Sequence, residues 1–269
     1  MRLFRSALRK LARRPATWVT FGLLAGLLTL IMLAVATVPA DGTGGPGGEG
    51  GDPLLLVTFP GAYALILGFI LGLGGLFSVI YGAAIAGSEW SWGTLKTVVA
   101  RGESRSRYML TTFAAIAVVM VLGLIVTFGI GVAAAALGAT LAGVSLAGMN
   151  DAAALGEIPE LIARGSVGLI TQCALGFAVA TLARSQLAGI GVGIAVYFGG
   201  TFATIFLPDI VQYLPFQLAD TALGTPAFGG GPPIAQSLSA DTALLLLVAW
   251  LAAYLVVAAG FTERAEITG

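Results

Sequence analysis

Few side chains in this sequence could carry out covalent chemistry. The chain has no histidine, which excludes Ser-His hydrolases, histidine-ligated haem and most zinc sites. Its single cysteine, Cys173, lies in an apolar run and is typical of a small core residue. No Gly-x-x-x-x-Gly-Lys-Ser/Thr pattern occurs, so the chain has no P-loop with which to hydrolyse ATP. The sequence therefore predicts no catalytic residue, no metal site and no cofactor on this chain.

The polar residues with the most informative spacing lie between residues 87 and 107. Thr94 can N-cap a short helix, Gly102 can end it in a left-handed conformation, and Ser104 can cap the helix that follows. The short helix has an apolar face with i, i+3, i+4 spacing, formed by Leu95, Val98 and Val99. The pattern predicts a transverse helix with basic neighbours, which is suited to dock into a groove on a partner protein.

The composition of the chain is that of a membrane protein. Of the 269 residues, 58% are apolar and only 10% are charged. A soluble domain has roughly 45–50% apolar and about 25% charged residues. A soluble fold of this length could not cover so much apolar surface, which excludes a soluble enzyme. Thirteen basic and thirteen acidic residues give no net charge, so no electrostatic argument favours nucleic acid as a partner.

Six apolar segments are long enough to cross a bilayer, which takes about 20 residues. They are residues 17–38, 61–86, 108–140, 161–183, 186–207 and 242–261. The third is too long for one simple crossing, so it tilts, breaks near Gly129 and Gly131, or projects beyond the membrane. We therefore expect residues 1–269 to form one all-α transmembrane domain.

The distribution of charge predicts the orientation of the six spans. Every basic residue except Arg164 falls at the N-terminus, in the loops on the same side as the N-terminus, or after the last span. Most acidic residues fall in the loops on the opposite side. The positive-inside rule then places both termini in the cytoplasm of a multi-pass protein of the plasma membrane.

Three further segments have a predicted place outside the spans. Residues 1–14 alternate apolar and basic residues with a helical period, which predicts an amphipathic helix on the cytoplasmic leaflet. Its polar face carries arginines that include Arg5, Arg9 and Arg13. Residues 41–53 are a glycine-rich external loop, and residues 208–240 form an external loop with a segment that dips into the membrane interface.

The predicted spans are almost free of ionisable residues. An ion-coupled transporter usually keeps a charge near the membrane centre, so this absence argues against one. Polar residues at a plausible depth are candidates for lining a transport pathway, and they are Ser78, Gln172, Thr201 and Thr204. Gln172 is the strongest of these candidates, and an interhelical hydrogen bond is the other interpretation of its position.

Over essentially its whole length, the chain resembles the permease subunit of an ATP-binding cassette (ABC) exporter of the second type. The shared pattern is an interfacial helix, six spans and a motif-bearing loop after the second span. The residues that carry the resemblance are Glu89, Gly93, Thr94, Ser104, Arg105, Leu214-Pro215-Phe216 and Phe261-Thr262-Glu263-Arg264. The sequence departs from the family at Gly102, where proline is frequent, and at Thr111-Thr112-Phe113, where the family often has a lysine.

The resemblance implies that two permease chains, identical or different, pair and that each docks on a separate ATPase subunit. That subunit would hold ATP and magnesium. The residues expected to serve docking in the coupling loop, residues 87–107, are Glu89, Gly93, Thr94, Leu95, Val98, Arg101, Ser104 and Arg105. Glu89 would bond locally to fix the loop, and the interfacial helix would act as an elbow against the ATPase. The implied function is ATP-driven export, and the apolar spans favour a hydrophobic or amphipathic substrate such as a lipid, peptide or drug.

Two other classes of function are compatible with six apolar spans. An ion-coupled secondary transporter predicts transport without an ATPase and sensitivity to ion gradients. A non-transporting immunity protein that sequesters a toxic peptide in the membrane predicts binding without ATP-dependent flux.

Overall fold

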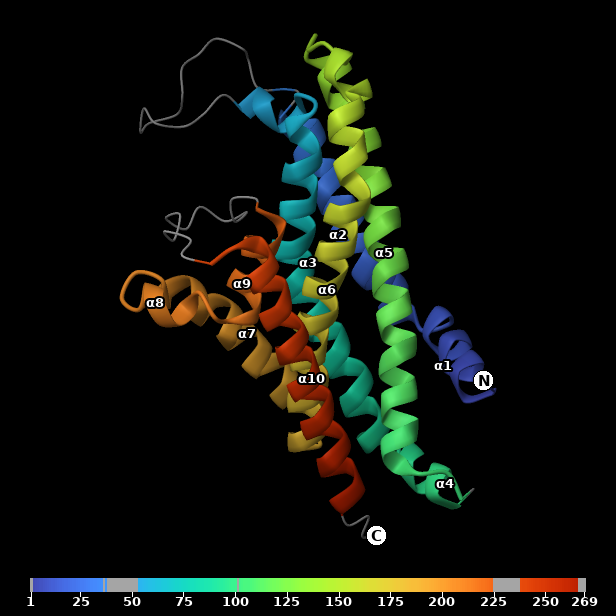
Figure 1. The fold of residues 1–269 in the computed structure, drawn as a ribbon. Helices are drawn as coiled ribbons and strands as arrows, with labels where there is room; N and C mark the ends of the chain where they lie inside the picture. The colour runs from blue at the N-terminus through green and yellow to red at the C-terminus, as the bar shows by residue number, and fades with distance from the viewer. Residues whose placement is uncertain (1, 36, 38–52, 101, 225–237, 266–269) are drawn as a thin grey trace.

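The computed structural model describes residues 2–35, 37, 53–100, 102–224 and 238–265, and every regular element among them is helical (Figure 1). The elements are α1 (Arg2–Ala12), α2 (Pro15–Val35), η1 (Pro53–Val57), α3 (Gly61–Ser91), α4 (Thr94–Ala100), α5 (Arg105–Leu141), η2 (Ala147–Asn150), α6 (Ala152–Ala183), α7 (Gln186–Ala203), α8 (Pro208–Val211), α9 (Pro215–Leu223) and α10 (Ala240–Arg264). The predicted glycine-rich loop lies outside the described residues except for Pro53, and so does Arg101.

Six of these helices, α2, α3, α5, α6, α7 and α10, are long and apolar enough to cross a membrane. The predicted all-helical membrane protein with six spans is therefore confirmed at this level. We call the end of the bundle that carries α4 and the end of α10 the α4 end; the turn between α5 and α6 and the helix η1 lie at the opposite end (Figure 1).

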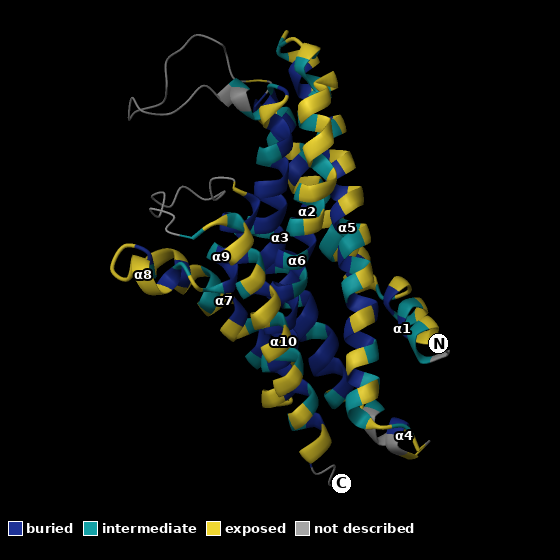
Figure 2. Cartoon of the chain, viewed as in Figure 1, coloured by how far each residue is buried: buried dark blue, intermediate teal, exposed yellow. Residues whose placement is uncertain are grey.

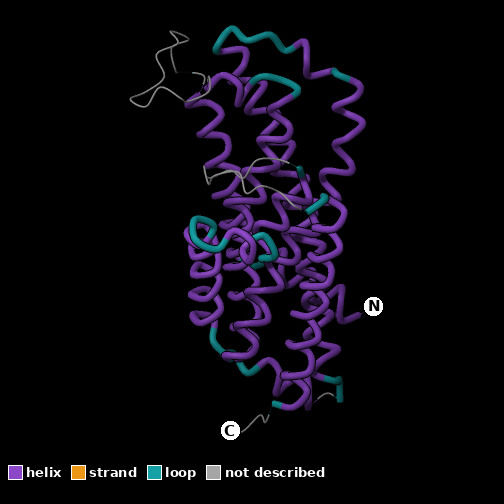
Figure 3. The backbone as a smooth tube through the Cα atoms, turned by 60° about the vertical axis from the view of Figure 1, so that its left-hand side comes forward, coloured by secondary structure: helices purple, strands orange, loops and turns teal. Residues whose placement is uncertain are grey.

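The long third span is one unbroken helix. α5 runs through Gly129 and Gly131 without interruption, and Gly131 lies against Leu28 and Ile66. Its 37 residues reach about 55 Å at 1.5 Å per residue, well beyond a hydrocarbon core of about 30 Å. Figures 1 and 3 show the α5–α6 hairpin extending past the ends of α7 and α10 at the end opposite α4. Of the alternatives open from the sequence, a break in this span is thus wrong.

The fourth long helix begins earlier than the predicted span. α6 starts at Ala152 instead of 161, because the Asp151 carboxylate caps it by accepting a hydrogen bond from the Ala153 N–H at 2.9 Å. The added residues include Glu157 and Pro159, which interrupt the apolar pattern without ending the helix. The length of the apolar run therefore identified only the predominantly apolar part of α6.

The centre of the bundle is formed by α3 and α6, which are the most deeply buried of the six long helices (Figure 2). Glycine permits their close approach: a Cβ on Gly82 would meet the Cys173 carbonyl oxygen, and one on Gly176 would meet that of Val79. By contrast, α2, α7 and α10 are mostly exposed, and side chains such as Leu245 point outward. Exposed apolar faces are what a helix in contact with lipid requires.

The first helix lies at an angle beside the bundle, towards the α4 end (Figure 1). α1 packs against α5 and buries Ala7 and Leu11. Arg5, Arg9 and Arg13 are exposed. The predicted separation of an apolar and a basic face is therefore present in α1.

Candidate functional site

Polar side chains from distant parts of the chain meet around Glu89, near the last turn of α3. Glu89 is fully buried. Its Oε1 accepts hydrogen bonds from Lys10 Nζ at 2.5 Å and Arg14 Nη2 at 3.3 Å, and its Oε2 accepts one from the Tyr108 hydroxyl at 2.8 Å. We call Glu89, Lys10, Arg14 and Tyr108 the Glu89 cluster. It joins α1, the turn before α2, α3 and α5 at one point.

The charges of this cluster are unequal, since two cations face one carboxylate. A buried carboxylate is tolerated only when it is paired and hydrogen-bonded, and here both oxygens have donors. Arg14 has further partners: Nη1 donates to the Ser88 hydroxyl at 3.0 Å, and the guanidinium lies 4.9 Å from the centre of the Trp92 ring. The cluster therefore fixes α1 and the start of α2 to the last residues of α3, immediately before α4.

The predicted transverse helix is present as α4, between two glycines in left-handed conformations. Gly93 has φ 62° and Gly102 has φ 77°, and α4 begins at Thr94. Both turns, at the positions predicted for the helix start and end, need the freedom of glycine. Val98 is buried, whereas Thr97 and Ala100 are exposed. Val98 thus packs α4 onto this chain, and the described side chains of Thr97 and Ala100 are on the solvent side.

The start of α5 is tied to the end of α10. Ser104 takes the predicted N-cap position with an extended backbone, but its side chain makes no capping hydrogen bond. Arg105 Nη1 donates to the Ala265 carbonyl oxygen at 2.5 Å, and the Ser106 N–H donates to Glu263 Oε2 at 3.2 Å. Arg105 is thus engaged within the chain. It serves to hold the loop in place.

A second cationic contact joins three long helices at the α4 end. Arg184 caps α6 with φ 51°, and its guanidinium lies 5.2 Å from the centre of the Trp90 ring and 5.5 Å from that of Phe261. Such cation–π contacts are worth about 0.5–2 kcal/mol. Together with the Glu89 cluster, this contact makes the α4 end a rigid junction of α1, α3, α5, α6 and α10.

The predicted pathway residues form two separate pairs. Ser78 and Gln172 are both buried beside Gly75: the Ser78 hydroxyl donates to the Gly75 carbonyl oxygen at 2.7 Å, and the Gln172 amide faces the Gly75 Cα. Among the described residues, Gln172 Oε1 has no hydrogen-bond partner. Thr201 and Thr204 lie at the end of α7, and each donates to a carbonyl oxygen of the same helix.

A charged group also marks a second boundary, at the level where α10 begins and short of the α5–α6 turn. Arg164 contacts Glu160 through Nε at 2.9 Å and Asp241 through Nη2 at 2.6 Å, which joins α6 to α10. From Arg164 to Arg184, α6 rises about 30 Å, the thickness of the hydrocarbon core of a bilayer. Between these two levels lies the part of α6 that faces α3 most closely. In α9, beside this boundary, burial raises the pKa of Asp220 to about 7.

The three partners of Glu89 were missed in the sequence. Lys10 and Arg14 counted there only as basic residues that set the orientation, and Tyr108 only as the first residue of a span. Lys10 and Arg14 stand 79 and 75 positions from Glu89 along the chain. A periodic pattern within a short stretch of sequence cannot reveal a pairing between residues so far apart. The available signal was a carboxylate that directly follows an apolar span, because such a group, once buried, requires a cation as its partner.

The fold defines an all-helical, multi-pass membrane protein. Residues 59–264 match the model of DUF2705, a family described as protein of unknown function, and the chain belongs to this family. It is also similar to the uncharacterized protein YhcI of Bacillus subtilis (strain 168), with 22% identity over 215 residues, or 72% of this chain. The chain spans 65% of the length of that relative. The family match includes Glu89, α4 and Tyr108, but not α1.

Proposed function

We propose that this protein is the permease subunit of an ABC exporter of the second type. In this proposal the chain lies in the plasma membrane with both termini and α4 in the cytoplasm. Support comes from the six spans, from the amphipathic α1 beside them, and from the short α4 held between two glycine turns. ATP and magnesium are held by a separate ATPase subunit, so the chain itself is a transport subunit and no enzyme.

The Glu89 cluster is the observation that carries this proposal. It lies just before α4 in the chain and joins α1, α3 and α5 through one buried carboxylate. Separating buried, hydrogen-bonded charges is expensive, so the elements that they join move together. A displacement of α4 by a partner would therefore be passed to α3, α5 and α1 as one rigid unit.

The ATPase would dock on the outward face of α4. Val98 anchors the inner face, so the contact uses the side that carries Thr97 and Ala100. The exposed Arg5 and Arg9 lie on α1, and Arg13 is exposed in the turn that follows it. In this proposal α1 acts as the elbow, and these arginines meet acidic groups of the ATPase or lipid phosphates. Gly93, Thr94 and Ser104 set the course of the loop in this arrangement.

Transport would take place between this chain and a second permease, identical or related. Ser78 and Gln172 are packed against Gly75, so these residues can line a passage only when α3 and α6 move apart. The outward faces of α7 and α10 are apolar. They favour a hydrophobic or amphipathic substrate, such as a lipid, a peptide or a drug, that moves outward along the seam between the two chains.

Purification of the chain with its partners tests this proposal. The full-length protein is isolated in mild detergent from its native host, and the proteins that accompany it are identified. We expect an ATP-binding cassette protein with the unmodified chain. We expect its loss from the double variant Thr97→Glu, Ala100→Glu, because two carboxylates on the exposed face of α4 would disrupt docking. Thr140→Glu, an exposed position at the opposite end of α5, should retain it.

The other outcomes separate the competing functions. If no ATPase accompanies the chain under conditions that preserve other membrane complexes, the proposal is wrong. Flux that responds to an ion gradient without ATP would then identify an ion-coupled transporter. Retention of a toxic peptide without any flux would identify a sequestering protein. Equal recovery of the ATPase with the α4 variant would place the docking surface elsewhere on the chain.

A further inference from the structure

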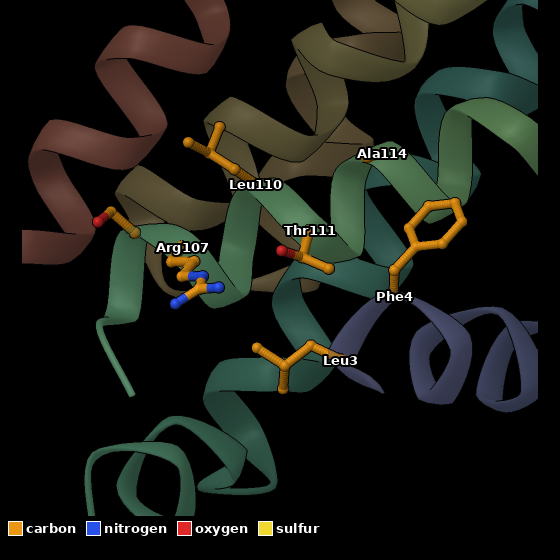
Figure 4. Close-up of a pocket in the computed structure, with 7 residues that line it drawn as sticks. Leu3, Phe4, Arg107, Leu110, Thr111 and Ala114 are labelled. Atoms are coloured by element: carbon orange, nitrogen blue, oxygen red, sulfur yellow. The ribbon is translucent and has the colours of Figure 1, made fainter. Parts of the chain in front are cut away.

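An open groove lies between α1 and the first turns of α5 (Figure 4). Its volume is about 520 Å³, within the range of small-molecule sites. The residues that line it include Phe4, Ser106, Arg107, Leu110, Thr111 and Ala114. Phe4 comes from α1, and the other five come from α5, so the groove exists only because α1 packs beside α5. We call it the α1–α5 groove.

The polarity of this groove changes along α5. Ser106 and Arg107 lie in the first turn of α5, nearest α4, Leu110 and Thr111 follow, and Ala114 lies furthest along α5 from α4. The distance along the helix axis from Arg107 to Ala114 is about 10 Å. Over a similar depth, the cytoplasmic leaflet changes from charged headgroups to acyl chains. The α5 side of the lining thus has the order of polar and apolar groups that a phospholipid has along its own length.

The cation at the polar end is available for a ligand. The side chain of Arg107 is 70% exposed, and its ion pair with Glu103 is long, at 3.8 Å between Nη1 and Oε2. Exposed pairs of this kind are worth at most about 1 kcal/mol, so a phosphate can displace the carboxylate. A guanidinium can also bind two phosphate oxygens at once. Arg5 and Arg9 are exposed on the adjacent α1 and add positive potential, which disfavours a choline headgroup.

We propose that the α1–α5 groove binds one anionic phospholipid of the cytoplasmic leaflet. Its phosphate lies at Arg107, and an acyl chain lies along Phe4, Leu110 and Ala114. The inference rests on the orientation given under the proposed function, because the negative lipids must be on the side of α4. By contacting both walls, the lipid holds α1 against α5, next to the Glu89 cluster.

The test uses the purified full-length chain, without any ATPase, in detergent with added phosphatidylglycerol. Lipid binding is measured by native mass spectrometry, and the thermal stability of each sample is recorded in parallel. We expect one phosphatidylglycerol molecule to bind tightly and to raise the melting temperature. Arg107→Gln should weaken this binding about tenfold, the effect of losing one charge-assisted pair. Arg107→Lys should restore part of it. Ala114→Trp, which fills the apolar end, should also weaken it.

Matched samples distinguish this site from general attraction to a basic surface. Arg9→Gln removes an exposed arginine of α1 that does not line the groove, and it should weaken binding much less than Arg107→Gln because Arg9 adds only to the surrounding potential. If Arg9→Gln and Arg107→Gln weaken binding equally, the groove is not the site. Equal binding of phosphatidylcholine, or of soluble glycerol phosphate, would overturn the proposed lipid. Since no ATPase is present, each of these outcomes is independent of whether one docks on α4.

Discussion

Glu89 is the residue on which the α4 end depends most, because three donors from α1, the turn before α2 and α5 meet at its carboxylate. Glu89→Ala would leave Lys10 and Arg14 partly buried without a counter-charge. Breaking a buried pair in this way costs about 3–5 kcal/mol, and we expect the lower figure because the Lys10 side chain keeps some contact with solvent. Reversible unfolding of the chain in mixed micelles measures this loss.

Glu103→Ala is the matched control, since Glu103 is a carboxylate at the same end whose pair with Arg107 is long and exposed. It should change the free energy of unfolding by less than about 0.5 kcal/mol. Tyr108→Phe, which removes only one donor to Glu89, should fall between the two. A Glu89→Ala protein as stable as the Glu103→Ala protein would show that the buried cluster does not hold the helices together.

The conformations of some residues at the α4 end could be predicted from the sequence, because they depend on local chemistry. The left-handed turn at Gly102 and the N-cap position of Ser104 follow from residue type and from the helices on either side. The engagement of Arg105 with Ala265 could not be predicted, because it joins residues 160 positions apart. The burial of Val98 against its own chain could not be predicted either, because a short apolar face has the same sequence pattern whether it packs on its own chain or on another protein.

Among the helices, the contact between α3 and α6 carries the most sharply defined prediction. A Cβ on Gly176 would meet the Val79 carbonyl oxygen, which belongs to the backbone and cannot rotate away. Gly176→Ala should therefore force α3 and α6 apart and destabilise the protein by about 1–3 kcal/mol, the usual effect of overpacking. The melting temperature of the purified chain is the measurement.

Gly191→Ala provides the comparison for this substitution within the same bundle. Gly191 is a helical glycine of α7, and nothing lies within 4 Å of its Cβ position. The change should be neutral or stabilising by up to about 1 kcal/mol, since alanine favours helix. Equal destabilisation by both substitutions would mean that helix propensity or lipid contact, and not the α3–α6 contact, sets the result.

The sequence predicted the ends of some helices more accurately than those of others. α2 and α10 begin and end within a few residues of the predicted spans, because their apolar runs stop at charged or loop residues. α6 is longer than predicted, since the Asp151 cap extends it through Glu157 and Pro159. The crossing of α3 and α6 depends on which glycines face each other, and that choice requires the three-dimensional fold.

For the molecule as a whole, the orientation in the membrane is the property on which both proposals depend. The residues that determine the orientation are distributed over the entire chain. Basic side chains gather at the α4 end, whereas Arg164, about 30 Å along α6 from Arg184, is paired with Glu160 and Asp241. The orientation can be measured through an introduced thiol, because the native Cys173 is fully buried and should not react.

We expect Ser145→Cys, in the exposed turn between α5 and α6, to react in intact cells with a maleimide that cannot cross the membrane. Ser104→Cys, exposed beside α4 and free of a capping hydrogen bond, should react only after the membrane is opened. The unmodified chain should stay unlabelled throughout. The reverse pattern would place α4 outside the cell, where neither an ATPase nor the anionic lipids of the cytoplasmic leaflet could reach it. That result would contradict both the proposed permease function and the proposed lipid site.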